Sequence, residues 1–70
     1  MAFEIGEKAI FTSPNGKQEE VVILKRAIDY EKGFIDEFNV KGNFDYFASV
    51  VRNSKTEQIF CSENELNSYE

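Results

Sequence analysis

The sequence predicts one small all-β domain over residues 1–70, a barrel of about five strands. Two turn signals predict it: a Ser-Pro-Asn-Gly run at residues 13–16 and an Asn-Ser-Lys run at residues 53–55. The stretches beside these turns are rich in β-branched and aromatic residues, which favour strands. A chain of 70 residues is near the lower size limit for folding alone, so dense apolar packing must stabilise it.

The first predicted hairpin follows an approach segment over residues 3–7. A short strand is expected at residues 8–12, where polar and apolar residues alternate weakly. Pro14 presets φ at the second position of the turn, and Asn15 and Gly16 tolerate positive φ. A hairpin loop is therefore expected directly after this strand.

Residues 18–30 predict a long, bent strand, because they include several β-branched residues and neither Gly nor Pro. A helix is the alternative for this window. Val21 and Ile23 fall on one face of the strand, and Val22 and Leu24 fall on the other. Apolar residues on both faces are typical of a strand that passes from one sheet of a barrel to the other.

Two interpretations remain for residues 31–43, which contain two glycines. An extended or hairpin-like insert is favoured, with a turn at residues 41–43. The alternative is one or two helical turns, in which Phe34, Ile35 and Phe38 would share a face.

The second predicted hairpin joins strands at residues 44–53 and 57–61. In the first of these strands, one face carries Phe44, Tyr46, Ala48 and Val50, and the other carries Phe47 and Val51. The second strand places Ile59 and Cys61 on one face.

A short 3-10 or helical turn is expected at residues 62–66. Ser62 and Glu65 have the S-x-x-E spacing of a capping box, in which each residue satisfies a backbone N–H of the other. Leu66 would then point into the core. The remaining residues are long enough only for a final edge strand or a frayed end.

The two ends of the chain carry a resemblance to a known fold family. The opening is Phe3-Glu4-Ile5-Gly6-Glu7-Lys8-Ala9 and the closing piece is Asn64-Glu65-Leu66. Together with the order of elements, these resemble the SH3-like barrels, in particular the small Tudor, KOW and chromatin-type members. The insert at residues 31–43 is longer than the usual connection between the second and third strands. The resemblance implies ligand binding by surface aromatics from the loops at one end of the barrel.

Charge and composition limit the function and the compartment. The net charge is −5, and residues 31–70 carry eight acids against four bases. Phosphate binding requires clustered Lys and Arg, so this balance argues against a general nucleic-acid binder. The chain begins without a signal-peptide pattern, lacks an apolar run long enough for a membrane helix and has a single cysteine. These features predict a cytoplasmic protein that does not enter a membrane.

Catalytic, metal and cofactor sites are not expected. The sequence has no histidine and no glycine-rich nucleotide motif, and its acids lack the spacing of an EF-hand loop. Cys61 lies on a predicted buried face, and the nearby Glu57 and Glu63 should raise its pKa, so it is interpreted as a structural thiol. The chain is therefore predicted to be a non-enzymatic protein without cofactor or metal.

The aromatic residues provide the candidate binding site. The chain has ten aromatic residues, more than so small a domain is expected to bury well, and six of them lie at residues 30–47. An exposed aromatic patch ringed by acids would bind a basic or methylated Lys/Arg peptide through cation–π and charge contacts. The candidate residues are Tyr30, Phe34, Asp36, Glu37, Phe38 and Tyr46. The alternative interpretation is that most of these rings belong to the core.

Two further functions are weaker hypotheses. A weak nucleic-acid-binding barrel would use a basic strip with Tyr46 as a stacking platform. The strip would comprise Lys8, Lys17, Lys25, Arg26 and Arg52. An acidic mimic of nucleic acid, of the kind found in mobile elements, would use the acids after residue 56 to occupy a basic groove. The partner is not identified by the sequence, and strand pairing into a homodimer stays open.

Overall fold

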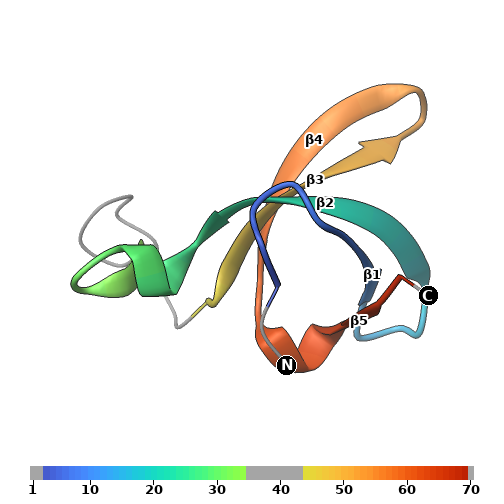
Figure 1. Ribbon diagram of the computed structural model, residues 1–70. Helices are drawn as coiled ribbons and strands as arrows, with labels where there is room; N and C mark the ends of the chain where they lie inside the picture. Colours follow the sequence, from blue (N-terminus) through green and yellow to red (C-terminus); the bar gives the residue numbers. More distant parts are fainter. Residues whose placement is uncertain (1–2, 35–43, 70) are drawn as a thin grey trace.

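The computed structural model describes residues 3–34 and 44–69 (Figure 1). Its elements are β1 (Lys8–Thr12), β2 (Gln18–Arg26), η1 (Ala27–Asp29), β3 (Tyr46–Arg52), β4 (Lys55–Cys61), η2 (Glu63–Glu65) and β5 (Leu66–Ser68). The strands form one antiparallel sheet in the order β4-β3-β2-β1-β5. The predicted all-β fold of five strands is confirmed. Within the described residues, β4 and β5 are the two edges of this curved sheet, and no ladder joins them.

The β1–β2 hairpin forms as predicted. Its turn is closed by the Ser13 N–H, which donates to the Lys17 carbonyl at 2.9 Å, and by the Gly16 N–H, which donates to the Ser13 carbonyl at 2.9 Å. Gly16 has a φ of 89°, which an L side chain rarely adopts. The Asn15 side-chain oxygen accepts the Lys17 N–H at 3.1 Å. The Pro-Asn-Gly signal therefore identified a turn whose geometry needs these residue types.

Strand β2 is bent, but it ends before the predicted boundary. A register shift lies between Ile23 and Lys25, where the strand bulges. Beyond Arg26 the chain enters the 3-10 turn η1, so the prediction of strand through residue 30 is wrong at its end. The Arg26 guanidinium binds both Asp29 carboxylate oxygens, at 2.9 and 3.0 Å, and the Ala27 N–H donates to the Asp45 carbonyl at 2.8 Å. These local bonds favour a turn over continued strand pairing.

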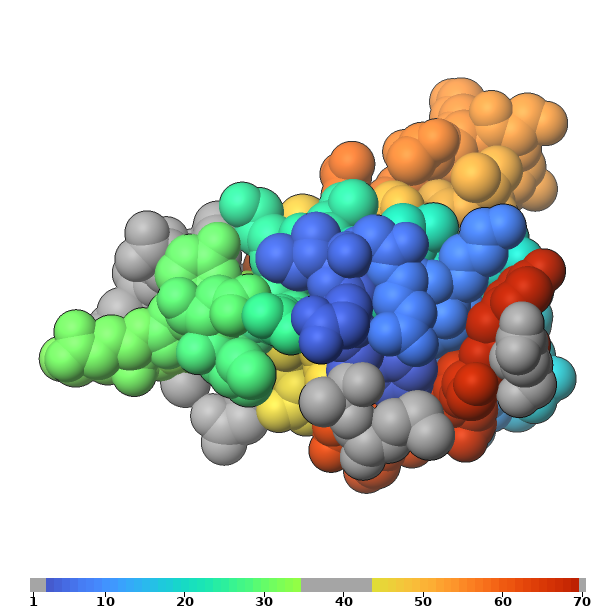
Figure 2. Space-filling view, viewed as in Figure 1, coloured from blue at the N-terminus to red at the C-terminus, as the bar shows by residue number. Residues whose placement is uncertain are grey.

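The β3–β4 hairpin also forms as predicted, with a two-residue turn. Asn53 and Ser54 have φ values of 52° and 64°, which is the pattern of a type I′ turn between Arg52 and Lys55. The tip of this hairpin projects beyond the body of the molecule (Figures 1 and 2).

The C-terminal turn η2 is capped as the sequence predicts. The Ser62 N–H donates to Glu65 Oε1 at 2.8 Å, and the reciprocal bond completes the capping box. Leu66 is buried, and β5 pairs with β1 through Phe11 and Leu66. The chain end therefore forms the short edge strand that was one of two expectations.

One core lies on the concave side of the sheet. Its members are Phe3, Ala9, Phe11, Val21, Ile23, Tyr46, Ala48, Val50, Cys61 and Leu66. The approach segment is bonded to β2, because the Gly6 N–H donates to the Ile23 carbonyl at 2.7 Å and the Ile23 N–H donates to the Glu7 carbonyl at 2.9 Å. This anchoring carries Phe3 into the core. Glu31 and Lys32 form a turn, and Gly33 and Phe34 are helical. The favoured extended insert is therefore wrong at its start, where the chain follows the helical alternative, and the rest of the predicted insert lies outside the described residues.

Candidate interaction surface

The structure places two predicted binding residues in the interior. Tyr46 is 4% exposed and Phe34 is 2% exposed, so the expectation that these rings reach the surface is wrong. Tyr46 follows the alternation of β3 into the core, where its hydroxyl accepts the Phe3 N–H at 3.0 Å. Its ring meets that of Phe3 edge to face with centroids 5.6 Å apart, and burial raises the pKa of its hydroxyl. Tyr30 is half-buried.

The remaining predicted binding residues are Asp36, Glu37 and Phe38. They lie outside the described part of the chain.

A second group of rings packs apart from the core cluster on the concave side of the sheet, and its member Phe34 is itself buried. We call it the outer aromatic cluster, and it comprises Tyr30, Phe34, Phe44, Phe47 and Phe60. Phe60 is its centre, with ring centroids 4.7 Å from Phe47, 5.3 Å from Phe34 and 5.9 Å from Phe44. Phe47 and Phe60 are cross-strand partners on the face of β3–β4 opposite the core. The hairpin therefore carries apolar side chains on both faces.

Sequence reasoning had not included Phe60 in the site. The sequence did contain a signal for it. Ile59 and Cys61 share one face of the strand, so Phe60 between them points to the opposite face, which also carries Phe47. Phe34 is the only fully buried ring of the cluster, and the other four rings are half-buried. Ile28 in η1 lies two residues before Tyr30 and is 75% exposed. The cluster and Ile28 thus offer partly accessible apolar surface.

The predicted basic strip is interrupted by ion pairs. Arg52 binds Glu19 through two hydrogen bonds of 2.8 Å and lies 3.3 Å from Glu57. The hydrogen bond from Arg52 lowers the pKa of the Glu19 carboxyl. Arg26 binds Glu4 at 2.8 Å, in addition to its bonds to Asp29. Since a guanidinium fork is the best phosphate ligand among side chains, these pairs remove the two strongest candidates for nucleic-acid contacts.

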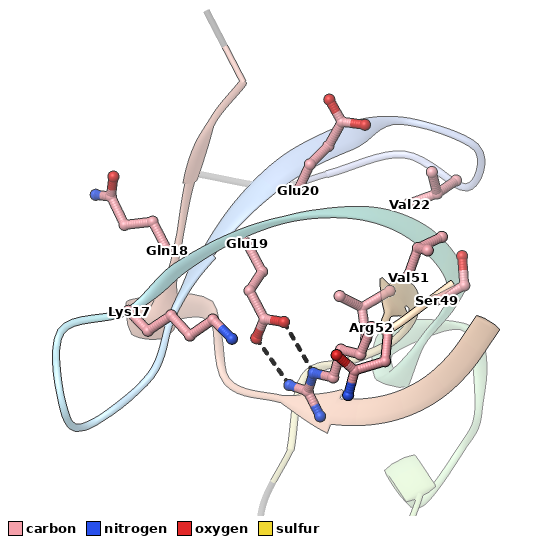
Figure 3. A pocket seen from close by; sticks show the side chains of 10 residues that line it. Lys17, Gln18, Glu19, Glu20, Val22, Ser49, Val51 and Arg52 are labelled. Carbon is pink, nitrogen blue, oxygen red and sulfur yellow. Dashed lines mark hydrogen bonds and ion pairs between the residues drawn. The ribbon is translucent and has the colours of Figure 1, made fainter. Parts of the chain in front are cut away.

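An open groove of about 500 Å³ lies where β2 and β3 diverge (Figure 3). The two strands pair only as far as Val21 and Val50, and the groove opens beyond that pair. The bond between Glu19 and Arg52 spans it, and the exposed Val51 lines its wall. Within the described residues, no three metal-binding side chains cluster here or elsewhere.

The free thiol is buried beside two acids. Burial is the main cause that raises the pKa of Cys61 to about 12, and the charges of Glu65 and Asp45 add to it. The prediction of a raised pKa is thus confirmed, but the acids responsible are not Glu57 and Glu63. A thiol with a raised pKa holds little of the nucleophilic thiolate at neutral pH, which agrees with the interpretation of Cys61 as a structural thiol.

No helix among residues 3–34 and 44–69 is long and apolar enough to cross a membrane. A comparison with protein-family models, curated proteins and solved structures finds no significant match to this chain. What the protein does must therefore be inferred from its own surfaces.

Proposed function

We propose that this protein is a non-enzymatic interaction module that binds a protein partner through the outer aromatic cluster and Ile28. The observation that carries the proposal is the gathering of four half-buried rings outside the core of a 70-residue domain. Aromatic side chains are enriched at the centres of protein interfaces, where they bury a large area at low cost in conformational entropy.

The proposed partner presents a basic segment. Glu31 is exposed and adjoins Tyr30 in the chain, which supports an acidic group near the aromatic rings. A Lys or Arg side chain, methylated or not, would meet both a ring face and a negative charge there. The net charge of −5 attracts such a partner at long range.

The two other functions have less support. Nucleic-acid binding needs cations that are free to meet phosphates, and both guanidinium groups described here are engaged with carboxylates. An acidic mimic would act through charge alone, and the aromatic cluster would have no part in its activity.

The test is affinity capture from the native cell extract, with and without nuclease, using the wild type and two variants. Ile28→Ser removes an exposed apolar side chain two residues before Tyr30, and Val51→Ser removes one of 68% exposure near the turn of the β3–β4 hairpin. Circular dichroism confirms that each variant is folded. We expect one protein partner to be retained after nuclease, with recovery reduced about tenfold by Ile28→Ser and unchanged by Val51→Ser.

Two results would contradict this proposal. If a partner is recovered only without nuclease, the protein binds nucleic acid, and its lysines become the candidate phosphate contacts. If Ile28→Ser and the wild type capture the same amount of partner, the partner does not bind at the surface that includes Ile28.

A further inference from the structure

The turn between β1 and β2 contains an Asn-Gly pair that is open to solvent. Asn15 and Gly16 are both exposed. In such a pair the glycine nitrogen can attack the carbonyl carbon of the preceding asparagine side chain and close a cyclic imide. Glycine has no side chain to hinder this approach. The local geometry therefore decides how readily the pair modifies itself.

The structure polarises the side-chain carbonyl of Asn15. The Lys17 N–H donates to Asn15 Oδ1 at 3.1 Å, and the Ser13 hydroxyl donates to the same oxygen. The Lys17 N–H also identifies this atom as the oxygen, because the amide nitrogen is a donor and cannot accept. Donors at a carbonyl oxygen stabilise the negative charge that develops there when a nucleophile attacks, as in an oxyanion hole.

The attacking nitrogen belongs to the same turn. The Gly16 N–H donates to the Ser13 carbonyl at 2.9 Å, which fixes the peptide group that follows Asn15. A Cβ placed on Gly16 would meet no atom within 4 Å, so the space beside this residue is open. The turn thus combines an accessible nucleophile with a carbonyl that two donors activate.

We propose that Asn15 and Gly16 form a succinimide in the folded protein, and that this ring opens to aspartate or isoaspartate. The Gly16 nitrogen loses its proton to a base of the solvent and bonds to Asn15 Cγ. The bond from Cγ to Nδ2 breaks, and Nδ2 takes up a proton and leaves as ammonia. Water then opens the ring at either of its two carbonyls.

The modification changes the charge and the backbone of the turn. Either product carries a carboxylate, so the chain gains one negative charge. Isoaspartate also adds a carbon to the main chain before Gly16, which displaces the Ser13 N–H and the Lys17 carbonyl that close the turn. The reaction involves neither Ile28 nor the outer aromatic cluster, so it is independent of the proposed function.

Two other asparagines precede serine and provide internal controls. Asn53 lies in the β3–β4 turn with a φ of 52°, and Asn67 pairs with Ile10 in β5. Within residues 3–34 and 44–69, no donor is bonded to the side-chain oxygen of either asparagine. The serine side chain also hinders the nitrogen that would attack. Both asparagines should therefore react more slowly than Asn15.

The first experiment incubates the full chain at several pH values from neutral to mildly alkaline. Digestion at acidic pH, where cyclisation is slow, and mass spectrometry then locate the products. We expect the mass increase of deamidation, with isoaspartate, to arise faster at Asn15 than at Asn53 and Asn67. The rate should rise with pH because the Gly16 nitrogen must lose its proton. Asn15→Gln is the control, since the extra methylene group makes cyclisation much slower.

The second experiment tests the role of the Ser13 hydroxyl. Ser13→Ala should slow the reaction at Asn15 about threefold to tenfold in the folded protein, the net value of one hydrogen bond. Ser13→Thr keeps a hydroxyl and should react like the wild type. In guanidinium chloride the three chains should react equally, because the turn is lost there. Circular dichroism confirms that each variant is folded in buffer.

Three results would overturn the proposal. They are an unchanged Asn15 in the folded protein, a rate at Asn15 no faster than at Asn53, and equal rates for folded Ser13→Ala and the wild type. The first two readouts use the wild type, so they test the proposal even if Ser13→Ala does not fold.

Discussion

Both faces of the β3–β4 hairpin carry apolar residues, but the two faces differ in how far those residues are buried. On the core face, Tyr46, Ala48, Val50 and Cys61 are all at most 4% exposed. On the outer face, Phe47 and Phe60 are half-buried and Val51 is 68% exposed. The same two strands therefore stabilise the domain with one face and keep apolar surface near solvent with the other.

The faces also differ in how their polar groups are satisfied. In the core, the Tyr46 hydroxyl accepts the buried Phe3 N–H, and the described residues have no buried side-chain polar atom without a partner. In the outer aromatic cluster the contacts are between rings, which tolerate several geometries. A surface of this kind can rearrange against a partner at lower cost than the core can. On this hairpin, burial and not apolar character therefore distinguishes the core ring of Tyr46 from the half-buried rings of Phe47 and Phe60.

The largest expected effect is on the core face. Ile23→Ala leaves a cavity at a side chain that is 0% exposed, and it should lower the free energy of unfolding by about 2–5 kcal/mol. Leu24→Ala, at the neighbouring bulged position, should cost much less because Leu24 is 36% exposed. Urea denaturation measures both. Equal losses would mean that the faces of β2 are not distinguished by burial.

A smaller effect is expected on the outer face. Phe47→Ala removes a half-buried ring and its contact with Phe60, so it should lower the free energy of unfolding by about 1–2 kcal/mol. The same urea experiment compares it with Ile23→Ala. If Phe47→Ala destabilises the protein as much, the outer cluster belongs to the folding core, and its use as a binding surface loses its basis.

The fold was more predictable than the site, for a physical reason. Turn chemistry at residues 13–16 and the Ser62–Glu65 capping box are local, and local sequence decides them. The end of β2 was misplaced because Arg26 forms a side-chain bond to Asp29 that outweighs the strand preference of residues 27–30. The periodicity of apolar residues cannot predict a side-chain bond of this kind.

The candidate site depended on which face each ring occupies across strands. Tyr46 and Phe47 are neighbours in sequence, yet one enters the core and the other joins the outer cluster. The sequence shows that Tyr46 and Phe47 point to opposite faces of the strand. It does not show which of the two faces packs into the core. The contact between Phe34 and Phe60 joins segments far apart in the chain, and only the fold brings them together.

The smallest expected effect concerns the ion pair that crosses the groove between β2 and β3. The Glu19 carboxyl is the more buried partner, and the hydrogen bond from Arg52 lowers its pKa below the ordinary value of 4.5. A lowered folded-state pKa means that the carboxylate stabilises the protein above the unfolded-state pKa, and that this contribution disappears as the pH falls through the folded-state value. Glu19→Gln should therefore cost up to about 1 kcal/mol at neutral pH.

Urea denaturation as a function of pH provides the measurement. The gap in unfolding free energy between the wild type and Glu19→Gln should be constant near neutral pH, narrow below about pH 4.5 and close at lower pH. Glu20→Gln is the matched control, because Glu20 is exposed and adjacent in sequence and should leave stability nearly unchanged at neutral pH. A gap of the same size at every pH would mean that Glu19 acts through packing and that its charge contributes nothing. The bond between Glu19 and Arg52 would then stabilise the two sides of the groove by its shape and not by its charge.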